Sequence, residues 1–295
     1  MAESLKVLRR RVRSVRSIKQ ITRAMEMVSA AKLRRAQATL MAGRPYARKL
    51  QQLISHVAGS TAIAENPLFH AREGNRKILV LFTSDRGLCG GFNHNLIREA
   101  QTRLKAEPDA DWKLVCVGRR GHDYFRRRPW PIVEKVIGLG GQPDDPEARR
   151  LADFLLDGFR NNECDVVTLV YPAFISTAVN KTTVEQYLPL TPEALGIEEE
   201  QEEGRESKEV DYILEPSAEL LLDSLLPRYL SSKTYITMAE AATSEHGARM
   251  IAMNNASKNC TELGDALTLQ LNKARQATIT RELLDIVGGA EALRG

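Results

Sequence analysis

Aromatic residues are scarce in this sequence, since Phe, Trp and Tyr together make up 5% of its 295 residues. Ala, Leu, Arg and Glu are abundant, and this composition favours long helices over a large β core. No run of about 18 consecutive apolar residues occurs, which argues against a membrane-spanning helix. The four cysteines form no CxxC pair, so the usual zinc and thioredoxin-like motifs are absent. We expect reduced, packed cysteines, as on a cytosolic face.

Catalytic and metal-binding motifs are missing as well. The five histidines do not have the spacing of metal ligands. Neither a G-x-S-x-G nucleophile elbow nor the protein-kinase set of motifs is present. We therefore expect no catalytic residue, no bound metal and no cofactor in this chain.

Proline is absent between Tyr229 and Val287, and glycine occurs there only at 247 and 264. The stretch from about 216 to 295 therefore predicts one helix, which at about 1.5 Å per residue would span on the order of 100 Å. Pro227 either starts its straight part or kinks its first turns. Within it, small and apolar residues recur in the alternating steps of three and four that are typical of a coiled-coil seam. These are Met250, Met253, Ser257, Cys260, Gly264, Leu267, Leu271 and Ala274. From the pattern alone, an amphipathic helix on a globular core remains an alternative.

A second long helix is predicted over about 3–57. Its apolar stripe begins with the same alternating steps of three and four residues. The spacing then continues after a one-residue slip and resumes beyond residues 43–45. The stripe consists of Leu5, Leu8, Val12, Val15, then Ile18, Ile21, Met25, Val28, then Leu33, Ala36, Leu40, and finally Leu50, Leu53, Ile54 and Val57. Because proline disrupts the helical ladder behind it, Gly43-Arg44-Pro45 predicts a kink or a break.

The charge of the chain is distributed unevenly. Residues 1–50 hold 14 Lys and Arg against Glu3 and Glu26, a net charge of +12, so the remainder carries −8 of the total of +4. Such a basic arm suits nucleic acid, anionic lipid or an acidic protein. No aromatic residue precedes Tyr46, and the arginines surround an apolar stripe, which disfavours nucleic acid.

The middle of the chain alternates between short apolar runs and helical segments. We expect strands at 77–83, 113–118, 131–139 and 165–171, an edge strand at 182–188, and helices at about 92–106, 120–127 and 146–161. Alternation of strand and helix predicts a mostly parallel sheet covered by helices. The acidic stretch 196–209 is predicted to be a solvated loop.

Glycines follow the first strand, at 87, 90 and 91 in the segment SDRGLCGGFN (84–93). Their spacing matches neither dinucleotide-binding nor phosphate-loop motifs, so we interpret them as permitting a tight turn and close packing. An α/β enzyme that uses a nucleotide and carries helical arms remains one alternative function. A basic coiled-coil module that binds nucleic acid is the other.

Two very long helices therefore bracket a small α/β domain. If this domain returns the chain near its entry, the end helices run antiparallel as one coiled coil. The C-terminal helix is the longer, so its tip should extend alone. We expect an N-terminal coiled-coil helix at 1–58, an α/β domain at 75–212 and a C-terminal coiled-coil helix at 213–295.

Three segments resemble the gamma subunit of F-type ATP synthase, and the resemblance extends over essentially the whole chain. ITRAMEMVSAAK (21–32) is similar to the N-terminal helix motif of that family, and SDRGLCGGFN (84–93) to its loop after the first strand. ITRELLDIVGGA (279–290) is similar to its C-terminal signature. The implied fold is α/β, with a long antiparallel coiled coil of the end helices and a Rossmann-like domain.

The resemblance also implies a role and partners. The coiled coil would be a central shaft inside a hexamer of alpha and beta subunits, and the α/β foot would sit with epsilon on the ring of c subunits. This places the protein peripherally on the cytoplasmic side of a bacterial inner membrane. The implied alpha and beta contacts are Met25, Arg275, Gln276, Thr280, Glu282 and Asp285, and Tyr212 would lie at the foot near epsilon and the c-ring. ATP chemistry would belong to the alpha and beta subunits, and no nucleic acid is implied.

Overall fold

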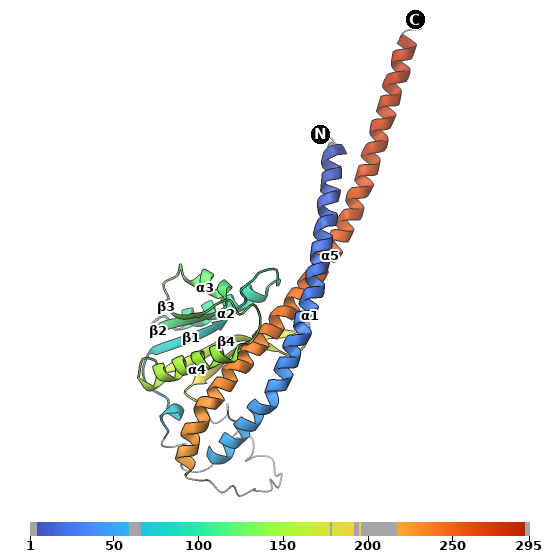
Figure 1. The fold of residues 1–295 in the computed structure, drawn as a ribbon. Helices are drawn as coiled ribbons and strands as arrows, with labels where there is room; N and C mark the ends of the chain where they lie inside the picture. The colour runs from blue at the N-terminus through green and yellow to red at the C-terminus, as the bar shows by residue number, and fades with distance from the viewer. Residues whose placement is uncertain (1–4, 59–65, 178, 192–194, 196–216, 293–295) are drawn as a thin grey trace, which may run out of the picture. The chain divides into compact units, whose positions relative to one another are not determined.

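The computed structural model describes residues 5–58, 66–177, 179–191, 195 and 217–292 (Figure 1). The chain forms two compact units. The coiled-coil unit is Met1–Ser29 with Met250–Gly295, and the sheet unit is Ala30–Arg249. Two long helices, α1 (Leu5–Ala58) and α5 (Ala218–Ala292), contribute to both units. The division at 1–58, 75–212 and 213–295 stays a prediction, because the boundary near 212 lies outside the described residues.

The sheet unit is built around five strands in the order β3-β2-β1-β4-β5. They are β1 (Arg76–Phe82), β2 (Asp111–Val117), β3 (Ile132–Val136), β4 (Val166–Phe174) and β5 (Asn180–Leu188). The connecting elements are a 3₁₀ turn η2 (Pro67–Phe69) and the helices α2 (Phe92–Ala106), α3 (Arg119–Phe125) and α4 (Asp145–Arg160). The strands β1 to β4 are parallel, and β5 is an antiparallel edge strand. The predicted Rossmann-like sheet is confirmed.

Helices cover both faces of this sheet. Side chains alternate between the faces along each strand, and the apolar strands therefore need cover on both sides. Leu79 and Leu81 point to a core shared with α2 and α3. Ile78, Val80 and Phe82 point to a second core, which α4 shares with the C-terminal part of α1 and the N-terminal part of α5. The sheet is therefore the middle layer of three.

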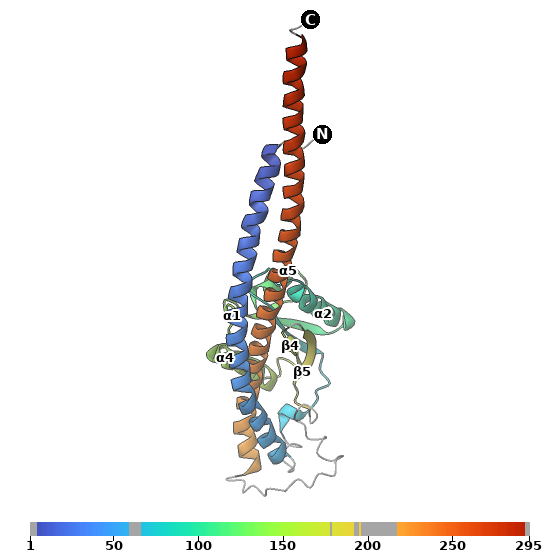
Figure 2. The same cartoon turned by 90° about the vertical axis from the view of Figure 1, so that its right-hand side faces the viewer.

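In the coiled-coil unit α1 and α5 run antiparallel and side by side (Figures 1 and 2). Asn254 donates to Glu26 at 2.7 Å, and a Cβ on Gly264 would lie 3.7 Å from Val15, so α5 numbers rise as α1 numbers fall. All eight predicted seam positions of α5 are buried or half-buried, and most of the residues between them are exposed. The antiparallel coiled coil is confirmed.

The predicted slip in the stripe of α1 is wrong. Ile18, Ile21 and Val28 are 49%, 57% and 56% exposed. The seam instead continues from Val15 to Leu33 without interruption, in steps of four and three, through polar side chains. These are Lys19, Thr22, Glu26 and Ser29, of which Thr22 and Ser29 are buried and the other two half-buried. Thr22 and Ser29 satisfy their hydroxyls by donating to backbone carbonyls one turn earlier, so they pack without an unpaired polar group.

The predicted kink or break at 43–45 does not interrupt α1, which continues through Pro45. A Cβ on Gly43 would lie 2.9 Å from Ile236, so this glycine permits a close approach to α5. Arg44 and Glu240 form an ion pair at 2.9 Å beside that contact. Pro45 and Met41 are exposed, so water can replace the helical hydrogen bond that proline removes. Pro227 likewise lies inside α5 and does not end it.

The C-terminal turns of α5 have no neighbour on α1. The last apolar residues packed against the cluster of Leu8, Val12 and Leu267 are Leu271 and Ala274. Every side chain from 279 to 290 is exposed. The expectation that this tip extends alone past the start of α1 therefore holds for the described residues.

Candidate functional site

The predicted contact residues occupy two bands of the coiled-coil unit. Met25 is half-buried on α1, next to the level of Asn254 on α5. Arg275 lies about 20 residues further along α5, which corresponds to roughly 30 Å along a helix axis. The structure therefore does not bring Met25 together with the C-terminal residues. Tyr212 lies outside the described residues.

Met25 lies beside the seam rather than in it. The seam positions around it are Thr22, Glu26 and Ser29, and Ser29 Oγ donates to the carbonyl of Met25 at 2.7 Å. The side chain is therefore partly covered by the coiled coil and partly open. A long side chain therefore fits at this position without entering the core.

The band at the end of α5 is open on all sides in the chain itself. Arg275, Gln276, Thr280, Glu282 and Asp285 are all exposed. Residues three or four apart share a helix face, so Gln276 and Thr280 lie on one face, and Glu282 and Asp285 lie on another. This band therefore presents polar groups in more than one direction.

Large apolar side chains are interspersed with these polar ones and are equally exposed. They are Ile279 at 48%, Leu283 at 57%, Leu284 at 65%, Ile286 at 68% and Val287 at 63%. A cluster of exposed apolar residues on one helix is a feature of interaction surfaces. The tip of α5 therefore has the character of a surface that another protein covers.

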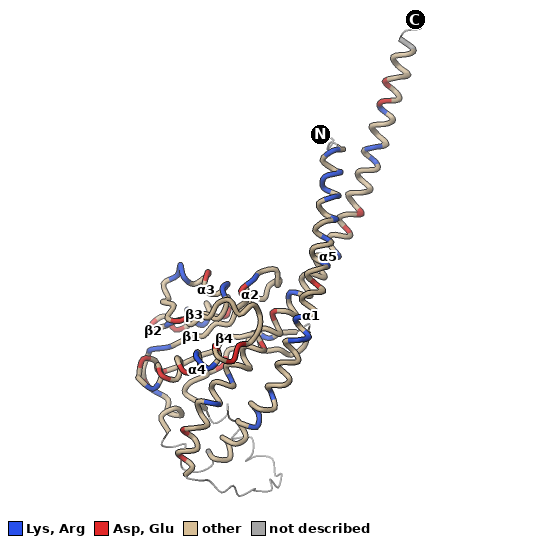
Figure 3. Tube along the Cα trace, in the orientation of Figure 1, with Lys and Arg blue, Asp and Glu red and all other residues tan. Residues whose placement is uncertain are grey.

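Positive charge dominates the other helix of the unit. Between Leu5 and Ser29, α1 carries eight Lys and Arg residues against Glu26 alone, and Figure 3 shows them recurring along this part of the helix. Lys6, Arg9, Arg10, Arg13, Arg16 and Arg23 are exposed. The charge is therefore available to an acidic surface outside the chain.

The sheet unit places α5 over the edge where sheets of this type bind ligands. Such ligands lie outside the carboxyl ends of the strands, where the strand order reverses. Here that point is between β1 and β4. Ser244 Oγ donates to the Pro172 carbonyl at 3.2 Å, and a Cβ on Gly247 would lie 3.1 Å from the Thr177 carbonyl oxygen. The position of a nucleotide is thus taken by the protein's own helix.

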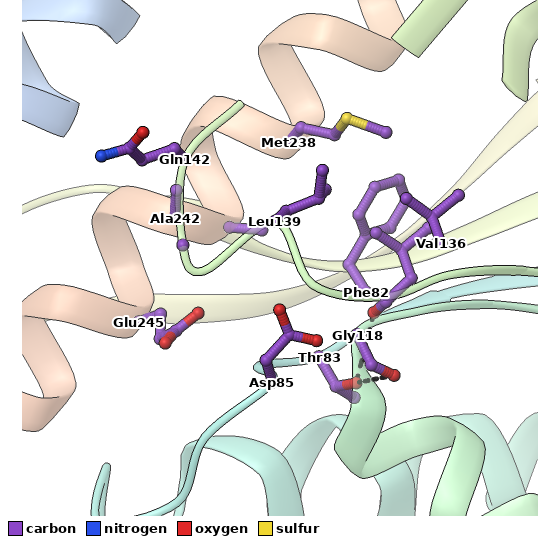
Figure 4. Close-up of a pocket in the computed structure, with 13 residues that line it drawn as sticks. Phe82, Thr83, Asp85, Gly118, Val136, Leu139, Gln142, Met238, Ala242 and Glu245 are labelled. Atoms are coloured by element: carbon purple, nitrogen blue, oxygen red, sulfur yellow. Dashed lines mark hydrogen bonds between the residues drawn. The ribbon is translucent and has the colours of Figure 1, made fainter. Parts of the chain in front are cut away.

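A small cavity remains beside this contact. Its volume is about 30 Å³, far below the roughly 300–1,000 Å³ of ligand pockets. Its walls include the ends of β1, β2 and β3, the loop after β3, and one side of α5, among them Phe82, Val136, Leu139, Met238 and Ala242 (Figure 4). The cavity has room for water and not for a nucleotide.

A buried polar cluster, which sequence reasoning missed, joins α5 to the loops at this edge. Arg249 pairs with Glu245 at 2.7 Å and donates to the carbonyls of Arg86 and Gly87, each at 3.2 Å. Burial raises the pKa of Glu245, and the neighbouring Arg249 opposes that shift. The sequence feature that could have indicated this cluster is the polar run SEHGAR (244–249) within an otherwise apolar part of α5.

His246 completes the cluster as a neutral imidazole. Its Nε2 lies 2.9 Å from the carbonyl oxygen of Gly141, and its Nδ1 lies 3.4 Å from a guanidinium nitrogen of Arg249. Since Arg249 can only donate, Nδ1 accepts and Nε2 donates. Burial lowers the pKa of His246 to about 4.

We expect His246→Gln to reduce the loss of stability in mild acid. The unfolded chain binds the proton at the ordinary pKa of about 6.5, whereas the folded chain resists it until about pH 4. The contribution of His246 to the free energy of unfolding is therefore fully present above about pH 6.5. It decreases as the pH falls towards 4, by up to about 1.4 kcal/mol per pH unit. Glutamine can still donate to Gly141 and accept from Arg249, but it does not titrate.

Urea unfolding of both full chains between pH 7 and pH 4 tests this expectation. The other charged groups facing His246, which are Glu245, Lys32 and Arg249, are present in both chains and cancel in the comparison. The stability difference should move in favour of the glutamine variant as the pH falls. A difference that stays constant over this range would show that His246 does not titrate as described.

The described residues offer neither a metal-binding cluster nor a helix that could span a membrane. They contain no group of three or more His, Cys, Asp or Glu side chains arranged to hold a metal ion. Neither long helix, nor any other helix in this part of the chain, combines the length and apolar character needed to cross a bilayer.

Known proteins resemble this chain over nearly its whole length. Residues 4–293 match the family described as ATP synthase. The ATP synthase gamma chain of Pelotomaculum thermopropionicum is 43% identical over 98% of this chain and 99% of its own length. That of Moorella thermoacetica is 47% identical over 97% of this chain and 98% of its own length.

Solved structures resemble the fold. A chain of the central stalk and c-ring structure of the Tetrahymena thermophila mitochondrial ATP synthase has a TM-score of 0.62 at 25% identity, covering 80% of this chain and 99% of that one. A chain of the Euglena gracilis mitochondrial ATP synthase structure with OSCP, F1 and c-ring has a TM-score of 0.66 at 20% identity. That match covers 98% of this chain and 94% of the other.

Proposed function

Because this chain belongs to the ATP synthase gamma-chain family, we propose that it carries proton-driven rotation of a c-ring to the catalytic sites of beta subunits. It is a gamma subunit, and its place in the complex is the rotor shaft of the central stalk. The coiled-coil unit is the shaft that turns inside the alpha and beta hexamer. The sheet unit is the part through which rotation enters.

The exposed tip of α5 is the observation that carries this proposal. Leu284 and Ile286 are 65% and 68% exposed at the end of a helix that has no neighbour on α1 there. A free helix end of this kind is unfavourable in water, whereas it is suited to an enclosing protein that presents apolar walls. A mix of apolar and small side chains allows sliding more readily than interlocking large ones would.

The proposed contacts with the hexamer follow the two bands. Met25 would face the acidic loop of beta, and Arg275, Gln276 and Thr280 would meet a second beta contact, with Glu282 and Asp285 in the signature beyond. The exposed cations of α1 support this, because positive charge is attracted to acidic loops over several ångströms without fixing one rotary position. Epsilon and the c-ring would bind the sheet unit near Tyr212, and the protein would lie on the cytoplasmic side of a bacterial inner membrane.

The proposed role is mechanical and not catalytic, with ATP bound by alpha and beta. The filled ligand edge of the sheet supports this assignment, because α5 lies where a nucleotide would bind and leaves a cavity of about 30 Å³. The same observation speaks against the alternative of a nucleotide-dependent enzyme. The alternative of a nucleic-acid-binding module is disfavoured, because no aromatic side chain occurs among the cations of α1 before Tyr46.

Co-expression with alpha, beta and epsilon subunits of a close relative tests the proposal. We expect the chain to purify in one complex with them. When this complex is bound to vesicles that hold the whole membrane part of the enzyme, we expect ATP to drive acidification of the vesicles. A hexamer that forms and pumps equally well without this chain would contradict the proposal.

We expect the activity of that complex to be independent of dithiol reductants. Cys89, Cys116 and Cys164 are buried, and burial raises the pKa of Cys116 to about 12 and of Cys164 to about 11. Few thiolates are therefore available for oxidation at neutral pH. ATP hydrolysis should be the same after treatment with dithiothreitol or with a mild oxidant. A reversible change of several-fold that Cys89→Ser abolishes would refute the expectation.

A further inference from the structure

The carboxylate of Asp85 binds three backbone N–H groups that come from two other loops. Its Oδ1 accepts from the N–H of Arg119, and its Oδ2 accepts from those of Gly138 and Gly140, all at 3.0 Å. Asp85 follows β1, Arg119 follows β2, and the two glycines follow β3. One side chain thus joins the loops at the carboxyl ends of three neighbouring strands.

These three N–H groups form a cradle of the kind that binds oxyanions. Converging backbone N–H groups at the carboxyl end of a parallel sheet are a recurrent site for phosphate and carboxylate ligands. Two of the donors belong to glycines, with φ of +97° at Gly138 and +64° at Gly140, a backbone region that favours glycine and turns both N–H groups towards the same carboxylate oxygen. In this chain the carboxylate of Asp85 takes the place of such a ligand.

The loops that Asp85 joins are the loops that bind α5. The carbonyls of Arg86 and Gly87, directly after Asp85, accept from Arg249. The carbonyl of Gly141, directly after Gly140, accepts from His246. If the loops after β1 and β3 separated, α5 would lose its partners on both.

We propose that the carboxylate of Asp85 occupies an oxyanion cradle of the sheet from within the chain and, by joining the loops after β1, β2 and β3, positions α5. It is a positioning residue, since among the described residues none of the hydrogen bonds of its carboxylate reaches α5. This role would explain an aspartate at the second position of the loop motif SDRG (84–87). The consequence for rotary coupling rests on the proposed function, whereas the cradle itself does not.

The surroundings of the carboxylate leave room for a substitute. Asp85 and Glu245 both line the cavity of about 30 Å³, Asp85 from the loop after β1 and Glu245 from α5 (Figure 4). Truncating Asp85 to alanine would remove the carboxylate and extend this cavity to the three N–H groups. Formate has the size and charge of the group removed, so it is the probe that fits.

The first test is the thermal unfolding of the full chain in sodium chloride and in sodium formate at equal ionic strength. We expect Asp85→Ala to lower Tm by roughly 5–10 °C in chloride, because three N–H groups lose a charged acceptor. Formate should restore at least half of that loss with a saturating dependence on concentration. The wild-type chain should not respond.

Asp144→Ala is the matched control. Asp144 also accepts a backbone hydrogen bond, from Glu147 N at 3.1 Å at the start of α4, but it binds one N–H instead of three. Its loss should lower Tm without any recovery in formate. An equal response of both variants to formate, or none from either, would overturn the cradle.

Asp85→Asn keeps the test decisive if the alanine variant does not fold. The amide oxygen of asparagine can accept from two of the N–H groups, but its NH₂ group faces the third donor. The Tm of this variant should lie well below that of the wild type. An asparagine variant as stable as the wild type would show that the negative charge is not needed.

The second test asks whether the cradle matters for coupling, in the complete complex reconstituted in vesicles. Asp85→Ala should lower the ratio of protons pumped to ATP hydrolysed, and formate should raise it again. If the wild-type complex does not pump, the proposed function fails. If the wild type pumps and Asp85→Ala pumps with the same ratio, the positioning role of Asp85 fails by itself.

Discussion

Replacing Met25 with lysine is expected to impair proton pumping while leaving assembly and ATP hydrolysis largely intact. The side chain is half-buried beside the seam, so a lysine can extend its charge into the surroundings of the shaft without entering the core. A new ion pair with an acidic loop of beta would stabilise one rotary position by on the order of 1–3 kcal/mol and not the others. Since 1.4 kcal/mol is about tenfold in rate, a barrier of this size would alter rotation.

Met25→Leu separates this effect from packing. It keeps an apolar side chain of similar size at the same place and adds no charge, so we expect pumping close to that of the wild type. ATP hydrolysis and ATP-driven acidification of vesicles are to be measured for both variants, together with the amount of assembled complex. If hydrolysis and pumping fall in parallel with assembly in Met25→Lys, Met25 is a packing residue and the contact assignment is wrong.

Gly118→Ala is expected to destabilise the sheet unit by about 4 kcal/mol or more, which is exceptional for a single substitution. Gly118 has φ +100°, which side chains with a Cβ rarely adopt. A Cβ there would lie 2.1 Å from the backbone oxygen of Thr83, so the strand ends of β1 and β2 would have to separate. The Thr83 hydroxyl, which accepts from the N–H of Gly121 at 2.9 Å, would be displaced as well.

Gly138→Ala is the control that isolates the steric clash. Gly138 has φ +97°, nearly the same as Gly118, but nothing lies within 4 Å of its Cβ position. The conformational cost alone is about 1–2 kcal/mol. Urea unfolding should therefore show a much larger loss for Gly118→Ala than for Gly138→Ala. Equal losses would mean that the backbone conformation, and not the contact with Thr83, limits residue 118.

Much of the fold is predictable because its elements have strong local signals. The strands are short apolar runs, the C-terminal helix has no proline for nearly 60 residues, and the seam of α5 follows its three-four spacing from Met250 to Ala274. Part of the C-terminal band is marked by the sequence as well, since Thr280, Glu282 and Asp285 lie in the segment 279–290 that resembles a family signature. Their exposure in the chain agrees with a role in contacting partners, which stays a prediction for each residue.

The seam of α1 could not be placed correctly from apolar residues. Between Val15 and Leu33 the buried positions hold Thr22 and Ser29, whereas Ile18 and Ile21 face outward. A hydroxyl that donates to its own helix packs almost as an apolar group, so hydrophobicity does not reveal it. The constant three-four spacing was the better guide, because a straight pair of helices does not tolerate a slip without a local change in winding.

The cluster around Asp85, His246 and Arg249 was missed for a different reason. Asp85 is separated from His246 and Arg249 by some 160 positions in the chain, so no local sequence pattern connects them. Only the folded sheet brings the loops after β1 and β3 to the same side of α5. Sequence reasoning could have noted polar residues in an apolar helix, but it could not have identified their partners.

The account rests on rotation of this chain inside the hexamer, and one measurement tests that claim directly. The alpha and beta hexamer is fixed to a surface, and a bead is attached to the sheet unit through a cysteine introduced at an exposed position such as Lys105. On addition of ATP the bead should turn stepwise in one direction, and it should stop when ATP is removed. A bead that stays still while the same complexes hydrolyse ATP, or that moves equally in either direction, would contradict the rotor assignment.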